Sequence, residues 1–482
     1  MPYILYALYG IIAVVVIFLA VLIIRAAAFN PKDNTRIIEE EESFDKEITV
    51  SRLQRLIRYK TVSYRDPSLE DDGEFKSFLA ALPELYPNVF AACEYKELPD
   101  RAILFCWKGK KEGNPAVLMA HYDVVPVNEE GWDKPAFEGI IENGVLWGRG
   151  SLDTKVTFNG VLSAAEHLIQ KGFIPEYDIY FAFSGGEEVN GKGAINIVDY
   201  FEENRLEPSM VVDEGGAVVE NVFPGVKVPC GLIGIAEKGM MDVRYTAKSG
   251  GGHASAPKPN SPLVALSKAC LKIEQNPFKY HVTKPVSLLF DTLGRHSSFV
   301  FKIVFANFGL FKGLVDSFMC KKQGGEINAL MRTTVAFTQS EGSTASNVIP
   351  PAASMVSNIR LNPEDNMDSA LQYLKDTVGE GVEVELLHGM NPSRISRTDC
   401  EAYEKVSSAV ASTWRGCIVS PYLMVQCSDS RHWGRISDRV YRFSAMDLTS
   451  EERATIHGNN ERIRLDCANR AVEFYIRLMK QL

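Results

Sequence analysis

Hydrophobic and polar positions follow two different periods along most of the chain after residue 45. Short apolar runs that are typical of buried strands are separated by segments in which apolar residues recur with a helical period. The pattern predicts helices over 47–59, 159–170 and 194–204, and strands over 102–107, 116–120, 179–184 and 210–212. Strands that alternate with helices in this way indicate an α/β domain with helices over a largely parallel sheet.

The pattern changes near Glu237. Residues 241–247 alternate as a half-exposed strand, 262–275 form an amphipathic helix, and 333–338 and 354–360 are typical of antiparallel strands. After Asn362 the alternation of helices and strands resumes and continues to the end of the chain. Because 482 residues are too many for one ordinary core, we expect an α/β domain in two parts, 46–236 and 362–482, with a smaller α+β domain inserted over 237–361.

The amino-terminal stretch is apolar without interruption. The 22 residues from Tyr3 to Ile24 carry no charge, and as a helix at ~1.5 Å per residue they reach about 33 Å, enough for a bilayer core of about 30 Å. We expect an uncleaved membrane anchor over 1–26 and a polar linker over 27–45. A cleaved signal peptide is the alternative, because Ala26–Ala28 offers small residues for cleavage. The basic residues after the span favour a cytoplasmic body, with a secreted body as the alternative; they are Arg25, Lys32 and Arg36.

One segment of the smaller domain, 299–319, is rich in phenylalanine and carries little charge. A buried helix or helical hairpin explains this composition. The alternative is an apolar patch that meets a membrane or a lipid-like substrate. Its phenylalanines are Phe299, Phe301, Phe305, Phe308, Phe311 and Phe318.

Charge and cysteine content exclude several functional classes. The net charge is −9, which argues against nucleic acid as a partner because phosphate binding requires a basic surface. The nine cysteines are scattered and include no C-x-x-C pair. This spacing indicates neither a zinc ribbon nor a disulfide scaffold.

Side chains that bind metals follow the predicted strands at four junctions. His121 ends an apolar strand with Asp123 two positions later, Asp153 follows a glycine-containing turn, and the pair Glu187–Glu188 and then Asp213 follow two further strands. Ligands bind at the carboxyl ends of strands in open α/β sheets. Two carboxylates 4 Å apart repel by about 4 kcal/mol at an effective dielectric of 20, and divalent cations remove that cost. Histidine and carboxylate ligands together suit zinc.

These junctions, together with Ile456-His457-Gly458, resemble the motifs of the aminoacylase, carboxypeptidase G and carboxypeptidase S family of dizinc metallopeptidases. The resemblance covers nearly the whole chain after residue 44. Within the family, segments 212–216, 236–239 and 347–351 are most similar to the N-fatty-acyl-amino-acid synthase/hydrolase enzymes. Ser184-Gly185-Gly186 differs from the His-Asp found before the glutamates in those enzymes, and Ala254 stands where serine is common.

The resemblance implies a role for each site residue. It implies two zinc ions, replaceable by cobalt or manganese, with Asp153 between them, His121 and Asp213 on one, and Glu188 and His457 on the other. Asp123 would orient His121, and Glu187 would be the general base. The inserted domain would be a lid that also forms the dimer contact. One lid residue that binds the substrate would come from the neighbouring subunit. Its His253 would stabilise the oxyanion, and the substrate would be held by Asn347 and Arg360. Arg431 has two interpretations, a carboxylate ligand or a structural salt bridge.

The sequence therefore predicts a membrane-anchored, metal-dependent hydrolase. It would cut an amide or peptide bond next to a free carboxylate, in N-acyl amino acids or small peptides. A metabolic N-deacylase or deacetylase on the same fold is the second hypothesis. A binding protein with an inactive site is the third, and it predicts missing ligands, whereas every ligand position here carries a ligand-type residue.

Overall fold

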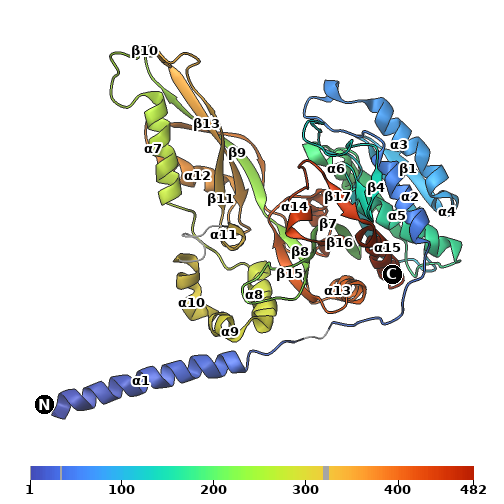
Figure 1. The fold of residues 1–482 in the computed structure, drawn as a ribbon, viewed down its shortest axis with the longest axis horizontal. Coiled ribbons are helices and arrows are strands. Elements are labelled where there is room, and N and C mark those ends of the chain that lie inside the picture. The colour runs from blue at the N-terminus through green and yellow to red at the C-terminus, as the bar shows by residue number, and fades with distance from the viewer. Residues whose placement is uncertain (1, 33–34, 318–324) are drawn as a thin grey trace.

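The computed structural model describes residues 2–32, 35–317 and 325–482, which form a large α/β unit, a smaller α+β unit and an N-terminal helix (Figure 1). An eight-stranded sheet with the order β1-β2-β6-β3-β7-β16-β8-β15 forms the centre of the large unit. Its strands are β1 (Cys93–Leu98), β2 (Ala102–Trp107), β3 (Ala116–His121), β6 (Ile179–Ser184), β7 (Met210–Val219), β8 (Cys230–Glu237), β15 (Ile418–Met424) and β16 (Val440–Leu448).

Strand direction makes this sheet mixed. The neighbours β6, β3, β7 and β16 are parallel, whereas β1 with β2, β2 with β6, and β8 with β16 are antiparallel. The prediction of a largely parallel sheet is correct for the middle of the sheet and for the edge pair β8–β15, and wrong for the other neighbours. Burial explains the difference, because the side strand β2 is as fully buried as the central β3 and β6, so the sequence pattern carries no information on direction.

Helices cover both faces of the sheet. Helix α5 (Lys155–Gln170) is buried along nearly its whole length because it lies between the sheet and two outer helices, α2 and α15. The helices that share its apolar core are α2 (Lys46–Ile57), α3 (Asp72–Leu85), α4 (Pro87–Ala92), α5 (Lys155–Gln170), α13 (Glu401–Thr413) and α15 (Leu465–Met479). The opposite face is covered by α6 (Gly193–Glu203) and η4 (Asp429–Arg435). The shorter elements are η1 (Pro67–Leu69), β4 (Ile140–Glu142), β5 (Val145–Trp147), η2 (Glu187–Val189), α14 (Ser450–Arg453) and β17 (Arg462–Arg464).

The smaller unit contains an antiparallel sheet with the order β11-β13-β9-β14. Its strands are β9 (Gly239–Lys248), β11 (Thr334–Glu341), β13 (Ala352–Leu361) and β14 (Glu383–Met390), and its core also includes α7 (Pro262–Gln275) and α12 (Met367–Val378). The short strands β10 (Gly252–His253) and β12 (Val348–Ile349) form its tip, far from the large unit (Figure 1). Because β14 pairs with β9, this unit continues past the expected boundary at 361 to Met390.

A helical excursion leaves the smaller unit between α7 and β11. It comprises α8 (Lys284–His296), α9 (Phe299–Ala306), α10 (Phe308–Leu314) and α11 (Gly325–Met331). Helix α8 packs on β15, and Phe290 and Phe305 join an apolar core that includes residues of β7 and β8. The segment 299–314 is helical as expected, but Phe305 is the only buried residue of α9 and α10, so the buried interpretation holds for its inner side alone. Phe318 and Met319 lie outside the described residues.

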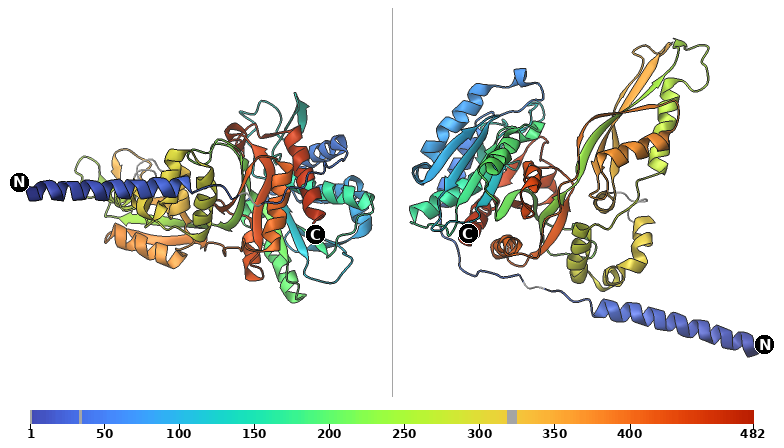
Figure 2. Two further views of the ribbon diagram at one scale, coloured as in Figure 1. Left: turned by 90° about the horizontal axis from the view of Figure 1, so that it is seen from below. Right: turned by 180° about the vertical axis from the view of Figure 1, so that it is seen from behind.

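The N-terminal helix α1 (Pro2–Ala27) projects from the body in every view (Figures 1 and 2). It is long and apolar enough to cross a membrane. The chain after it follows the surface of the large unit, where the Ile38 N–H donates to Ser412 Oγ at 2.8 Å and Arg477 donates to the Ile38 carbonyl at 3.1 Å. The predicted linker is thus attached to the large unit by specific contacts.

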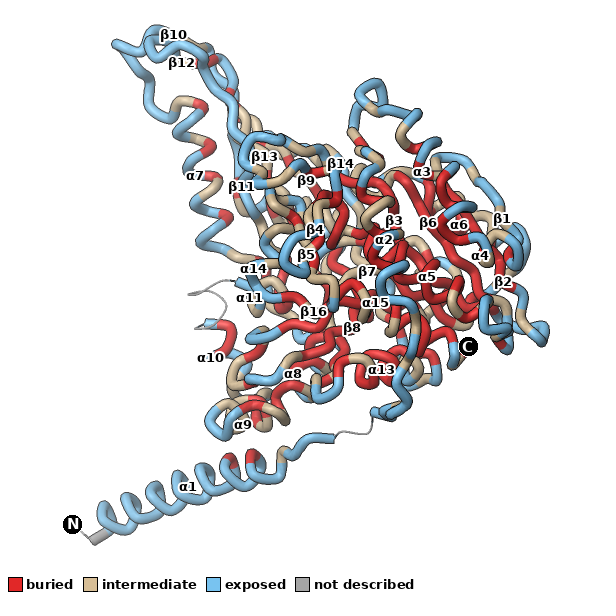
Figure 3. Tube along the Cα trace, turned by 45° about the vertical axis from the view of Figure 1, so that its right-hand side comes forward, coloured by how far each residue is buried: buried red, intermediate tan, exposed pale blue. Residues whose placement is uncertain are grey.

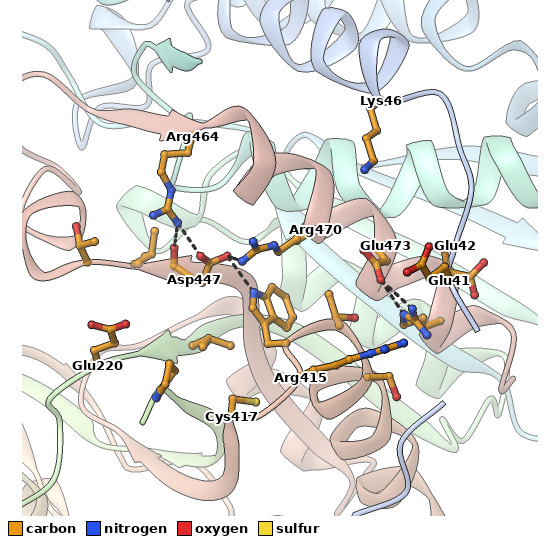
Figure 4. A pocket seen from close by; sticks show the side chains of 18 residues that line it. Glu41, Glu42, Lys46, Glu220, Arg415, Cys417, Asp447, Arg464, Arg470 and Glu473 are labelled. Carbon is orange, nitrogen blue, oxygen red and sulfur yellow. Dashed lines mark hydrogen bonds and ion pairs between the residues drawn. The ribbon is translucent and has the colours of Figure 1, made fainter. Parts of the chain in front are cut away.

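A pocket lies where this linker meets the large unit (Figure 4). Asp447 accepts a hydrogen bond from Trp414 Nε1 at 2.9 Å, and its carboxylate lies 2.7 Å from Arg464 and 3.0 Å from Arg470. The described residues that line it include no histidine. Asp447 therefore pairs with both arginines, and the histidine-containing site described next lies elsewhere.

Candidate metal centre

The metal-type side chains gather at the carboxyl ends of the central parallel strands. His121 is the last residue of β3, and Glu187 and Glu188 begin η2 directly after β6. Glu214 belongs to β7, Asp153 precedes α5, and His457 follows α14. Parallel strands end at the same edge of a sheet, which explains why segments so distant in sequence meet here.

Asp153 lies between two imidazoles. One of its carboxylate oxygens is 3.1 Å from His121 Nε2, and the other is 3.0 Å from His457 Nε2. His457 Nε2 is also 3.1 Å from Glu188, and His121 Nε2 is 3.3 Å from Glu214. The arrangement has two ends that share one carboxylate, which is the donor pattern expected for a pair of cations.

Asp123 supports the site from behind. Its carboxylate lies 3.4 Å from His121 Nδ1 and accepts the backbone N–H groups of Glu187 at 3.1 Å and Glu188 at 3.2 Å. His121 Nδ1 also lies 3.0 Å from the Asp123 carbonyl. One buried carboxylate therefore faces the non-ligand nitrogen of His121 and holds the turn that carries both glutamates, as a supporting residue of a metal ligand does.

The structure does not bring Asp213 into this group. Its carboxylate accepts the backbone N–H of Ser430 at 2.9 Å, on the side of η4. Strand β7 continues past Val212 to Val219, and successive side chains on a strand point to opposite faces. Glu214 therefore points to His121, whereas Asp213, the ligand expected from the sequence, points towards η4.

The carboxylates of the site are buried, so a bound proton or a cation is needed to neutralise them. Burial raises the pKa of Glu187 well above its ordinary value, raises that of Glu188, and raises that of Glu214 to about 8. Hydrogen bonds to Asp153 and Glu188 raise the pKa of His457 to about 10. Buried carboxylates that lack a cation therefore hold protons instead.

The donor atoms fit a pair of divalent cations. Ligand atoms of His121, Asp153 and Glu188 lie within 4.8 Å of one another, and so do those of His121, Glu187 and Glu214. The buried Glu188 Oε1 has no hydrogen-bond partner among the described residues. His457 has φ 59°, a left-handed conformation that is uncommon outside glycine and often marks functional sites.

A buried ion pair holds the two loops that carry Asp153 and His457. Glu461 lies 2.6 Å from Arg149, and it accepts the backbone N–H groups of Leu152 at 2.7 Å and Asp153 at 3.2 Å. Arg149 also donates to the Gly458 carbonyl at 2.9 Å. Both side chains of the pair are buried, so the pair fixes the spacing of the two metal-type residues.

Replacement of Glu461 by Gln is expected to destabilise the fold by about 3–5 kcal/mol, because it leaves the buried Arg149 without its counter-charge. Chemical denaturation of the purified protein measures this loss. The matched control is Glu383→Gln, since Glu383 pairs with Lys248 on the surface and exposed pairs contribute about 0–1 kcal/mol. Equal stability of the two variants would contradict the structural role of Glu461.

The predicted residues of the smaller unit divide into two groups. Arg360, on β13, reaches the catalytic side, where its guanidinium donates to Cys427 Sγ at 3.5 Å, and Cys427 lines the cavity at the metal-type residues. His253 and Asn347 instead lie exposed at the tip, where the Asn347 carbonyl accepts the Ala254 N–H. Within one chain, the structure does not bring these two residues to the site.

Arg431 has structural partners. It donates to the Asn391 carbonyl at 2.7 Å and lies 3.6 Å from the buried carboxylate of Glu237. These contacts favour the structural salt bridge over a role in binding the substrate carboxylate.

Comparison with known proteins places this geometry in a family. The model of peptidase family M20/M25/M40 matches residues 117–481. The chain belongs to this family. M20 peptidases are metal-dependent and typically dinuclear, which agrees with the donor set. The chain is therefore an enzyme of the peptidase and amidohydrolase type rather than a binding protein on the same fold.

This M20 chain is similar to other proteins along nearly its whole length. It is 31% identical to N-fatty-acyl-amino acid synthase/hydrolase PM20D1 of Xenopus tropicalis, over 96% of this chain and 93% of that protein. It is 30% identical to "Probable carboxypeptidase S-like 2" of Dictyostelium discoideum, over 96% of this chain and 91% of that protein. Its fold matches an M20 family metallo-carboxypeptidase of Sulfolobus solfataricus with a TM-score of 0.67 and 17% identity, over 90% of this chain and 98% of that one.

Proposed function

We propose that this M20 enzyme is a two-metal amidohydrolase that cleaves N-acyl amino acids beside their free carboxylate. The observation that carries the proposal is the carboxylate of Asp153, 3.1 Å and 3.0 Å from the imidazoles of His121 and His457. His121 and Glu214 would complete one metal position, and Glu188 and His457 the other. Zinc suits this set of imidazole and carboxylate donors, with cobalt or manganese as substitutes.

The chain's own residues would handle the proton. Two cations in such a site lower the pKa of water and polarise the amide carbonyl. Glu187 lies within 4.8 Å of ligand atoms of His121 and Glu214, and burial raises its pKa, which favours uptake of a proton. Glu187 would remove the proton from the attacking water and then give it to the leaving amine. Asp123 would keep His121 in the tautomer that points Nε2 at the metal.

A cavity extends from the metal-type residues and favours an acyl group as the second half of the substrate. It measures ≈ 500 Å³, with Asp153, Glu187, Glu188 and His457 at one part. Its lining also includes apolar side chains, namely Ala217, Val219, Leu232, Tyr422, Met424, Met446 and Leu448, together with the polar Glu326, Gln426, Ser444 and Arg453. An apolar wall next to a polar reacting centre suits a hydrocarbon chain better than a second peptide unit.

A substrate panel tests this assignment. We expect the zinc-loaded enzyme to hydrolyse N-acyl amino acids with long acyl chains at a higher kcat/KM than N-acetyl amino acids or dipeptides. A preference for N-acetyl substrates would favour the second hypothesis, a metabolic deacetylase. The absence of hydrolysis across the panel with two metals bound would overturn the proposal.

Arg360 would bind the substrate carboxylate. Its planar guanidinium can donate two parallel hydrogen bonds to a carboxylate, and it lies at the rim of the cavity through its contact with Cys427. Arg360→Met is expected to raise KM for an N-acyl amino acid by about 10–100-fold, the value of one or two charge-assisted hydrogen bonds at 1.4 kcal/mol per tenfold. Steady-state kinetics with the free acid and its methyl ester measure the effect.

Arg244→Met provides the control, because Arg244 is an exposed arginine of the same sheet that pairs with Glu385. The Arg360 variant should lose the preference for the acid over the ester, and the Arg244 variant should retain it. An unchanged preference in the Arg360 variant would remove Arg360 from the carboxylate site.

His253 would act in the neighbouring subunit of a homodimer. It is exposed at the tip of the smaller unit, and its Nδ1 lies 2.7 Å from Ser255 Oγ, which orients the ring. A symmetric dimer that brings this tip over the partner's metal centre would supply the oxyanion donor and place Asn347 beside the substrate.

Mixed dimers test this arrangement. His253→Ala chains and Glu187→Gln chains are expected to be inactive alone and to regain about a quarter of wild-type activity when equal amounts are refolded or co-expressed together, because half of the dimers then contain one complete site out of two. Activity of the mixture no higher than the sum of the separate variants would contradict action across the dimer.

The helix α1 would anchor the enzyme in a membrane with the body on the cytoplasmic side. The basic residues that follow the span support this orientation, and the eight cysteines that the structure describes are free, as is usual in a reducing compartment. A protease-protection assay on intact cells distinguishes it from a secreted body: external protease should leave the catalytic body uncut.

A further inference from the structure

The carboxyl-terminal end of α1 is fixed against the helical excursion. Leu22 and Ala26, four residues apart on one face, are its only buried residues among those described, and the rest of the helix is exposed (Figure 3). Asn307 Nδ2 donates to the Leu22 carbonyl at 3.2 Å. Just beyond the helix, Arg295 donates to the Asn30 carbonyl at 3.0 Å, and its guanidinium lies 4.3 Å from the centroid of the Phe29 ring. The helix therefore leaves the body beside α9.

The segment 299–314 next to this junction is apolar on its outer side. Four large side chains are at least half exposed there, namely Phe299 (50%), Val300 (71%), Leu310 (57%) and Leu314 (61%). The inner side is held to the body through Phe305, whose ring centroid lies 4.7 Å from that of Phe223 and 5.5 Å from that of Phe290. Among the described residues, these four side chains are not covered by other parts of the protein. The packing of Phe305 on the inner side holds the segment against the body.

The charge of the segment has one sign. Its only charged residues are Lys302 and Lys312, and it contains no acidic residue. Helices that lie in a membrane interface combine large apolar side chains with lysine or arginine, since the apolar groups enter the acyl region and the cations face the headgroups. Because the chain as a whole carries a charge of −9, a purely basic and apolar segment beside the anchor is a local feature.

The contact with α1 sets the depth of the segment. Leu22 lies five residues before Ala27, the last residue of α1 (27 − 22), which is about 7.5 Å along the axis at 1.5 Å per residue. Interfacial helices are buried about 5–10 Å below the membrane surface. A bilayer that surrounds α1 therefore reaches the level of Asn307 and the exposed side chains on either side of it.

We propose that the segment 299–314 lies in the interface of the same lipid bilayer that α1 crosses, as a second membrane contact. The inference rests on the proposed role of α1 as an anchor. Together the helix and the segment make two points of attachment, and these fix the orientation of the catalytic body over the membrane. A second copy of the chain on the same surface is the competing occupant.

Quenching of an added tryptophan by lipid tests the inference on the full chain. The Leu310→Trp protein is placed in nanodiscs that hold one chain each, made of phosphatidylcholine with or without bromine on the upper acyl carbons. The contribution of the five native tryptophans is subtracted with wild-type protein. The matched control is Leu69→Trp, because Leu69 is 62% exposed on the large unit, and Ile12→Trp reports on α1.

We expect brominated lipid to quench the tryptophans at positions 310 and 12 at least about twofold more than the tryptophan at position 69. Leu314→Trp repeats the measurement in case the first variant misfolds. Strong quenching at 12 with no more quenching at 310 and 314 than at 69 would overturn the inference and leave the anchor intact. Equal quenching at 12 and 69 would overturn the anchor as well, and neither result bears on the hydrolase activity.

Discussion

Glu187→Gln is expected to lower kcat by about 10²–10⁴-fold while two metal ions per chain remain bound, since this is the usual contribution of a positioned general base. The Glu187 carboxylate lies within 4.8 Å of ligand atoms of His121 and Glu214, so it would be close enough to take a proton from a water activated at this site. It is not required for either imidazole contact of Asp153. Steady-state kinetics and metal quantification on the same preparation separate catalysis from binding.

Glu220→Gln is the control for this variant, because Glu220 is an exposed glutamate directly after β7. It should retain wild-type kcat. Loss of both metals in Glu187→Gln would make Glu187 a ligand, and retention of full kcat would exclude it as the base. Each of these results points to a different correction of the proposed mechanism.

Glu214→Gln and Asp213→Asn are expected to differ in metal content. Glu214 lies 3.3 Å from His121 Nε2, so its replacement should reduce bound metal from two ions to one per chain after dialysis and lower kcat/KM by at least about 10²-fold. Asp213 instead accepts the Ser430 N–H, so Asp213→Asn should keep two ions. Elemental analysis of dialysed protein measures the stoichiometry.

The metal contents of the Glu214→Gln and Asp213→Asn variants can be compared directly, because each variant serves as the control for the other. They are adjacent acidic residues in one strand, and both side chains are shielded from solvent. A circular dichroism melt establishes that each variant is folded before its metal is counted. If Asp213→Asn loses a metal and Glu214→Gln does not, the ligand expected from the sequence is restored and the assignment of Glu214 is wrong.

Most secondary structure could be predicted because the buried positions of this chain recur with the period of a helix or of a strand. Strands β2 and β6 begin and end at the expected residues, and so does α7. Helix α5 begins at Lys155, four residues before the expected start at Asn159. Its first turn lies against buried backbone and carries Lys155, which donates to the carbonyls of Leu56 and Tyr59, so tertiary contacts rather than amphipathicity determine where it starts.

The position of the candidate site could be predicted because glycine-rich junctions follow buried strands. His121, Asp153, Glu188 and His457 were all expected there, and the structure brings them together. Glu214 was missed because the end of β7 depends on pairing with β16, which departs from regular register after Asp213. Asp213 of β7 pairs with Arg442 of β16, which is distant in the sequence. The local pattern of apolar and polar residues therefore gives no information about this pairing.

The limits of the smaller unit also depended on distant pairing. Strand β14 alternates in burial like any half-exposed strand, and its position after a helix gave the same pattern as the α/β alternation that follows. Only its pairing with β9 assigns it to the smaller sheet. The proposed action of His253 in a neighbouring chain raises a similar difficulty, since the residues beside which it would act belong to that chain.

Crystals of the zinc-loaded protein, measured on both sides of the zinc absorption edge, test the central claim most directly. The account predicts two anomalous peaks that flank the Asp153 carboxylate, one beside His121 and Glu214 and the other beside Glu188 and His457. A single peak, or peaks remote from Asp153, would contradict it.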